Sequence, residues 1–139
     1  MKYQELKGYK YELMESLSIQ TGIFGTRLKL LSGKIRYAIL YEDGWLIIES
    51  GYQWDGMSGV GDSKQSMRAS LVHDALYQLM REGLLDRKYK DAADRLLEKI
   101  LIEDGASKFN AWLCYQGVKM FGKKSTYPEK KPRGKIVEI

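Results

Sequence analysis

Cysteine and histidine are nearly absent from this chain, which has one of each, Cys114 and His73, among 139 residues. A single cysteine excludes an internal disulfide framework and a zinc site built from several cysteines, and it suits a reducing cytoplasm. No apolar run approaches the roughly 20 residues that a membrane helix needs, and charged residues interrupt the start of the chain. We therefore expect a protein with no signal peptide and no segment inserted in a membrane.

Acidic residues are scarce at the C-terminal end of the sequence. Residues 123–139 contain six lysines and arginines against Glu129 and Glu138, so they carry +4 of the formal net charge of +5. Two prolines oppose regular structure in this segment. We expect a single domain over residues 1–122 and a solvated basic tail over 123–139, whose charge suits an acidic partner or a nucleic acid.

Four segments rich in β-branched and aromatic residues are typical of strands: residues 9–13, 27–31, 35–41 and 45–49. Ser32-Gly33 is placed to turn between the second and third segments. Asp43-Gly44 predicts a two-residue hairpin turn in which both central positions have a positive φ. We expect an N-terminal antiparallel sheet of about four strands joined by hairpins.

Beyond the strands, the apolar residues recur with a helical period. We expect a first helix capped by Asp62 or Ser63 and ended by Gly83, a second over residues 89–103, and a third that Ser107 caps. Strands followed by helices predict an α+β fold in which three helices cover one face of the sheet. Regular structure should stop where the basic tail begins.

His73 is the one side chain able to exchange protons near neutral pH without a perturbed environment. On the first helix it shares a face with Tyr77, whereas Asp74 projects about 100° away. A short connection makes the first two helices antiparallel neighbours, which places Asp94 of the second helix opposite His73. A carboxylate that accepts one imidazole N–H leaves the other nitrogen free to take a proton, so the pair predicts a general base with its orienting acid.

A glycine-rich loop over residues 54–62 precedes the first helix and can bring backbone close to a ligand. Asp55 and Asp74, with carbonyl groups of this loop, are hard oxygen ligands suited to Ca²⁺ or Mg²⁺, which would stabilise a developing oxyanion. Ser58 is a candidate nucleophile or hydrogen-bond donor. The acidic neighbours and the lack of a surrounding βαβ unit disfavour a phosphate or dinucleotide site.

The same residues also suit a purely structural role, which the sequence favours over catalysis. In that interpretation His73 bonds to Asp94, Asp74 bonds to backbone N–H groups of the glycine-rich loop, and Tyr77 closes the network. The polar centre is then a clasp that holds the loop against the helix pair. Buried polar networks of this kind favour one unique packing arrangement.

The order of these motifs resembles a family of small proteins of unknown function encoded mainly by bacteriophages and prophages. The resemblance covers about residues 45–122 and rests on Trp54-Asp55-Gly56-x-Ser58, on His73-Asp74-Ala75-Leu76-Tyr77 and on Ala93-Asp94. It implies a phage setting, in the host cytoplasm or the virion, with other phage proteins or further copies of the chain as partners. In that setting the structural interpretation predicts a virion or assembly component.

A more remote similarity is to secreted phospholipases A2, which also place a glycine-rich calcium loop before a helical His-Asp-x-x-Tyr run. That resemblance implies His73 as general base, Asp74 and loop carbonyls as calcium ligands, and Asp94 as the orienting acid. The chain departs from those enzymes because it has too few cysteines for their disulfides. The alternative function is therefore a metal-assisted hydrolase of the esterase or lipase kind.

Overall fold

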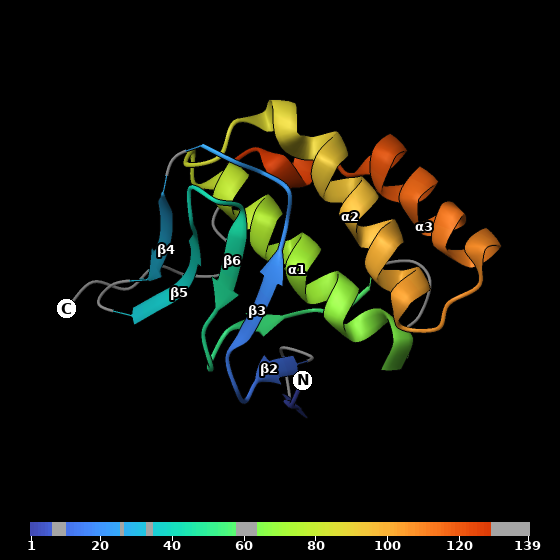
Figure 1. Cartoon of the computed structure of the whole chain (residues 1–139), viewed down its shortest axis with the longest axis horizontal. Coiled ribbons are helices and arrows are strands. Elements are labelled where there is room, and N and C mark those ends of the chain that lie inside the picture. Colours follow the sequence, from blue (N-terminus) through green and yellow to red (C-terminus); the bar gives the residue numbers. More distant parts are fainter. Residues whose placement is uncertain (7–10, 26, 33–34, 58–63, 129–139) are drawn as a thin grey trace.

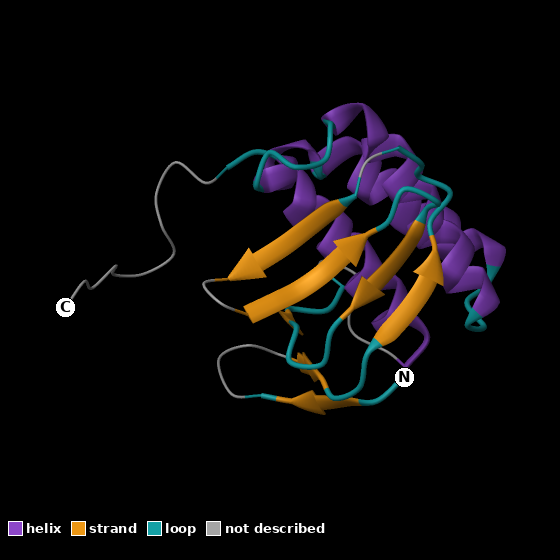
Figure 2. Ribbon diagram, turned by 60° about the vertical axis from the view of Figure 1, so that its left-hand side comes forward, coloured by secondary structure: helices purple, strands orange, loops and turns teal. Residues whose placement is uncertain are grey.

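The computed structural model describes residues 1–6, 11–25, 27–32, 35–57 and 64–128. Antiparallel strands occupy the N-terminal half of these residues and three helices follow (Figure 1). The helices gather on one face of the larger sheet (Figure 2). The predicted α+β class and order of elements are confirmed. No helix in these described ranges has both the length and the apolar character needed to cross a bilayer.

Within the described residues, seven strands form two sheets rather than one. The larger sheet has the order β3-β6-β5-β4 and the smaller one the order β1-β2-β7, with every pairing antiparallel. The bounds are β1 Tyr3–Glu5, β2 Tyr11–Leu13, β3 Leu17–Gln20, β4 Leu28–Ser32, β5 Ile35–Leu40, β6 Trp45–Ile48 and β7 Gln53–Trp54. The sequence predicted β2, β4, β5 and β6. It missed three strands of two to four residues, which are too short for an alternating pattern to distinguish them from loops.

The turn between β5 and β6 differs from the prediction. Tyr41 N–H donates to the carbonyl of Trp45 at 2.8 Å, and Gly44 N–H donates back to the carbonyl of Tyr41 at 3.0 Å. Among the described residues only glycines have a positive φ, and Gly44 has a φ of 89°. The loop therefore has three residues, with one left-handed position instead of two, which is the next most common hairpin geometry. The predicted Ser32-Gly33 turn falls partly outside the described residues.

Helix α1, Lys64–Arg81, is the centre of the core. Leu71, Leu76 and Leu79 have no exposed surface and share one apolar cluster with Leu46 and Ile48 of β6. Burial of this apolar surface is the main favourable contribution to folding. Helix α1 is therefore held by apolar contacts along much of its length. These contacts fix the position of the polar side chains on α1 relative to the sheet and to α2.

The other two helices are α2, Lys90–Glu103, and α3, Lys108–Phe121. Gly83, with a φ of 74°, follows the end of α1, as predicted. Ser107 Oγ accepts the N–H of Asn110 at 3.1 Å, which confirms the predicted cap of α3. The proposed caps of α1, Asp62 and Ser63, lie outside the described residues.

Regular structure continues past Gly122, contrary to the sequence prediction. A short 3-10 helix, η2, spans Lys123–Thr126, and a second one, η1, spans Arg87–Tyr89 ahead of α2. Arg87 Nε donates to the Thr126 carbonyl at 3.0 Å, and Arg81 Nη1 donates to the Ser125 carbonyl at 2.9 Å. Two arginines thus satisfy the backbone of η2 and hold it beside α1, an arrangement that local sequence does not encode.

Candidate functional site

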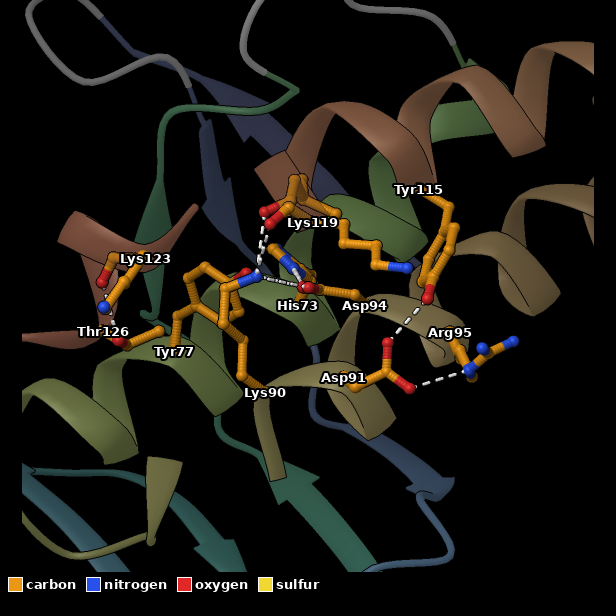
Figure 3. Close-up of polar contacts among 11 residues, drawn as sticks. His73, Tyr77, Lys90, Asp91, Asp94, Arg95, Tyr115, Lys119, Lys123 and Thr126 are labelled. Carbon is orange, nitrogen blue, oxygen red and sulfur yellow. Dashed lines mark hydrogen bonds and ion pairs between the residues drawn. The ribbon is translucent and has the colours of Figure 1, made fainter. Parts of the chain in front are cut away.

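The side chains of His73 and Asp94 meet between α1 and α2. His73 Nε2 lies 2.8 Å from Asp94 Oδ1 (Figure 3). The predicted contact between the two residues is therefore confirmed. It forms because α1 and α2 pack side by side and the connection between them is short.

Asp94 is enclosed by hydrogen-bond donors. Its side chain has 0% exposure, and besides the bond to His73 it accepts Tyr77 Oη–H at 2.6 Å and Lys90 Nζ–H at 2.7 Å. Burial raises the pKa of Asp94, but the hydrogen bonds from His73, Lys90 and Tyr77 outweigh it and bring the pKa below the ordinary value. Asp94 is therefore an ionised carboxylate at neutral pH.

The ionised Asp94 determines which nitrogen of His73 carries the proton. A carboxylate only accepts hydrogen bonds, so Nε2 must donate, and the lone pair of the neutral imidazole lies on Nδ1. Nδ1 has no partner among the described residues, and in this part of the chain no buried side-chain nitrogen or oxygen lacks one. Nδ1 is therefore reached by solvent, although the His73 side chain is only 12% exposed.

Lys90 ties this pair to the third helix. Its Nζ donates to the Val118 carbonyl at 3.0 Å and approaches the Lys119 carbonyl at 3.4 Å (Figure 3). The sequence analysis missed Lys90. The signal that identifies it is the i,i+4 spacing from Lys90 to Asp94 on α2, which is the spacing of a helical ion pair.

Tyr77 packs directly on the imidazole. The two ring centroids are 4.0 Å apart. Burial, followed by the bond to Asp94, raises the pKa of Tyr77 far above its usual range, so the hydroxyl stays protonated and always donates. The site positions Tyr77 as a support for Asp94 and the His73 ring, and its hydroxyl is not available as a base.

Asp74 lies beside the pair in a different environment. Its Oδ2 is 3.5 Å from the Tyr52 hydroxyl, whose shorter bond, at 2.7 Å, goes to Gln78. Burial raises the pKa of Asp74, the positive charge of Arg81 lowers it in part, and the negative charge of Asp55 raises it further. Among the described residues the one hydrogen-bond partner of Asp74 is Tyr52. The predicted bonds from Asp74 to the loop backbone involve residues 58–62, which lie outside the described residues, and stay a prediction.

The predicted divalent-cation ligands, Asp55 and Asp74, are close enough for their charges to interact. Residues 1–57 and 64–128, apart from the short gaps in the first range, contain no group of three or more histidine, cysteine, aspartate or glutamate side chains placed to hold a metal ion. The loop carbonyls over 58–62 that the sequence adds to this ligand set lie outside the described residues, as does Ser58. The carboxylates alone, with the Arg81 cation beside them, fit a divalent ion poorly.

A cleft of about 860 Å³ opens between β7, α1, α3 and η2. His73, Asp74, Tyr77 and Asp55 all line it. One side is apolar, with Leu113, Val118 and Phe121 of α3, and the other carries Asp55, Asp74 and Arg81. On the β7 side, Trp54 Nε1 donates to Ser70 Oγ at 3.1 Å and fixes the strand to α1. The free imidazole nitrogen thus belongs to a residue in the wall of a ligand-sized cleft.

The family described as "Protein of unknown function (DUF1353)" matches residues 45–118. This span is more than half of the chain, and it contains β6, β7, α1, α2 and the His73–Asp94 pair. No curated protein and no solved structure matches the sequence. The chain belongs to the DUF1353 family, which confirms the expected kinship with proteins of unknown function; the phage setting and the similarity to phospholipases A2 stay predictions.

Proposed function

We propose that this member of the DUF1353 family is a hydrolase in which His73 acts as general base. One observation carries the proposal: an ionised, fully buried Asp94 holds Nε2 of His73 and leaves Nδ1 without a partner among the described residues, on a side chain that lines the cleft. A clasp that only holds helices together has no need of a solvent-reached nitrogen. A general base needs one.

The chemistry follows from that geometry. A water molecule bound at Nδ1 gives this nitrogen a proton while its oxygen attacks the carbonyl carbon of an ester or amide. The imidazolium that forms is stabilised by Asp94, and it then returns the proton to the leaving alkoxide or amine. Arg81 and Lys124, both in the cleft wall, are the cations available to stabilise negative charge on the substrate.

The apolar wall of the cleft indicates the kind of substrate. Leu113, Val118 and Phe121 suit an acyl or other apolar group, and the polar wall opposite suits the carbonyl and its leaving group. An ester with an apolar acyl chain fits both walls. No step of this mechanism requires the divalent cation that the sequence suggested.

A second candidate is the structural role, in a virion or assembly component of phage origin. The observation in its favour is Lys90, which joins Asp94 of α2 to two carbonyl groups of α3 and so links three helices through one carboxylate. In this alternative the partners are other phage proteins or further copies of the chain. The two candidates differ in what the loss of His73 should do.

His73→Gln separates them, because a glutamine Nε2–H can still donate to Asp94 while the amide offers no basic nitrogen. We expect the variant to hydrolyse p-nitrophenyl esters of graded chain length at least about 100-fold more slowly than the wild type. Its melting temperature should change little. Asp91→Asn, on the same helix as Asp94 but in an exposed pair with Arg95, is the control and should keep full activity.

A wild-type protein that hydrolyses none of the esters or the matching anilides, with and without added Ca²⁺ or Mg²⁺, would contradict the proposal. Equal rates for wild type and His73→Gln would contradict it as well. A large drop in melting temperature for His73→Gln, in a protein without activity, would instead favour the structural role.

A further inference from the structure

Helix α3 is apolar on two opposite faces. Its inner face carries Ala111, Cys114 and Tyr115, which are buried. Its outer face carries four large apolar residues whose side chains are 45–68% exposed: Phe109, Trp112, Leu113 and Met120. Their spacing of three, four and seven residues places them along one stripe. A helix that is apolar all round is normally buried, so the outer face is suited to a second contact.

The position of α3 leaves this outer face uncovered. In Figure 1 the helix lies at the margin of the molecule, beyond α2 and away from the sheets. Its main contacts within the described part of the chain are with α2 and η2. Phe109 and Trp112 stack on each other, with centroids 6.3 Å apart, rather than on another element. The larger contiguous apolar patches on protein surfaces commonly mark interaction sites.

The charge around the outer face has one sign. Between Asp104 and Glu129 the sequence has no acidic residue and four lysines: Lys108, Lys119, Lys123 and Lys124. Asp91 of α2 interacts with the charge of Lys119, and it is already paired with Arg95 at 2.8 Å. A partner that matches this surface is therefore apolar in its centre and negatively charged around that centre.

We propose that α3 docks its outer face on the surface of an anionic lipid bilayer, lying along the membrane and not crossing it. Phe109, Trp112 and Met120 would enter the boundary between headgroups and acyl chains, while the lysines meet lipid phosphates. A combination of tryptophan, phenylalanine and leucine with lysine is typical of helices that lie in this interface. A second copy of the chain fits less well, because it would set lysine against lysine.

Docking would bring the cleft to the membrane. Leu113 and Phe121 are exposed on α3 and also line the cleft. The docked surface and the cleft are therefore continuous. The inference goes beyond the proposed hydrolase and does not depend on it, because binding to a bilayer needs neither His73 nor a reaction.

Sedimentation of the full chain with vesicles tests the proposal. We expect binding to vesicles of equal parts phosphatidylglycerol and phosphatidylcholine, and little to phosphatidylcholine alone. Phe109→Ser with Trp112→Ser should lower the partition coefficient at least about 10-fold. Lys108→Gln with Lys119→Gln should lower it roughly 25-fold, because each basic residue near an anionic surface contributes about fivefold.

Two matched variants serve as controls, since Phe24 and Lys29 are as exposed but lie on the sheet side of the molecule. Phe24→Ser and Lys29→Gln should bind like the wild type, and so should His73→Gln, even if no hydrolysis is found. Circular dichroism establishes that each variant is folded.

Three outcomes would overturn the proposal. One is the absence of binding to anionic vesicles. Another is binding that survives loss of Phe109 and Trp112, because attraction by basic residues elsewhere would then suffice. The third is a wild-type dimer in analytical ultracentrifugation that the Phe109→Ser, Trp112→Ser variant abolishes, because the outer face would then bind a second copy.

Discussion

Asp94 and Asp74 lie on neighbouring helices beside the same histidine, yet their ionisation is shifted in opposite directions. Asp94 is the more buried of the two and has the lowered pKa, because three side chains donate to it. Burial raises the pKa of Asp74, and the charge of Arg81 with the 3.5 Å contact from Tyr52 does not offset it. Burial raises the pKa of both carboxyls, and only Asp94 has enough donors to outweigh it.

The strongest way to break this contrast is to remove the Asp94 carboxylate. Asp94→Ala leaves Lys90 and the His73–Tyr77 pair without their shared acceptor, so we expect a loss of about 3–5 kcal/mol in the free energy of unfolding. Urea unfolding at pH 7 measures it. Asp91→Ala, which breaks an exposed ion pair with Arg95 and one hydrogen bond from Tyr115, should cost about 1–2 kcal/mol. If Asp94→Ala and Asp91→Ala lowered the unfolding free energy equally, the buried Asp94 network would contribute no more to stability than an exposed pair.

A subtler change removes one donor and leaves Asp94 intact. A Cβ on Gly122 would stand 2.5 Å from the Tyr77 hydroxyl and from the Val118 carbonyl. Gly122→Ala should therefore push Tyr77 off Asp94 and cost roughly 1–3 kcal/mol in unfolding free energy.

Gly117→Ala is the matched control for that substitution. Gly117 lies inside α3, and a Cβ added to it would meet nothing within 4 Å. We therefore expect Gly117→Ala to stabilise the protein by about 0.5–1 kcal/mol. Urea unfolding of both variants should give opposite signs. The same sign for both would show that the approach of Gly122 to Tyr77 does not constrain the fold.

The pH dependence of stability sharpens the comparison. The folded pKa of Asp94 lies below its unfolded value of about 3.9, so its stabilising contribution is present above about pH 4 and is lost as the pH falls through the folded pKa. Asp94→Asn lacks this contribution. Between about pH 4 and pH 2, the wild type should therefore lose more unfolding free energy than Asp94→Asn, measured by urea unfolding at each pH. Parallel curves would mean that Asp94 has an ordinary pKa.

The smallest effect is expected at Asp74, with the opposite sign. Because its folded pKa is raised, the folded state carries the cost of a buried charge once the pH rises above that pKa. Asp74→Asn should be as stable as the wild type at pH 7 or more stable by up to about 1 kcal/mol. At pH 3, where both side chains are neutral, the difference should vanish. A clear destabilisation at pH 7 would indicate that Arg81 stabilises the Asp74 charge by more than burial penalises it.

Much of the fold was predictable because its signals are local. The helical period, the Ser107 cap and Gly83 mark the helices within a few residues. The meeting of His73 with Asp94 was also predictable, because a short connection makes two helices antiparallel. The Lys90–Asp94 pair was within reach of the same reasoning, since its spacing is that of an i,i+4 pair.

Other features had no sequence signal. The pairing of β1 and β7 with β2 depends on contacts between distant residues, and η2 depends on Arg81 and Arg87 reaching its carbonyl groups. The described partner of Asp74 is Tyr52, 22 residues away in the connection between β6 and β7. Each of these contacts depends on tertiary packing between residues far apart in the chain, so no short stretch of sequence predicts it.

The sequence by itself determined the order of strands and helices and the shared face of His73 and Tyr77, because hydrophobic period and helix geometry act over a few residues. Only the tertiary structure decided which nitrogen of His73 is left free and which aspartate has its pKa lowered. Those properties depend on donors brought from α1 and α2, on the carbonyl groups of α3 that hold Lys90 in place, and on the exclusion of water from Asp94.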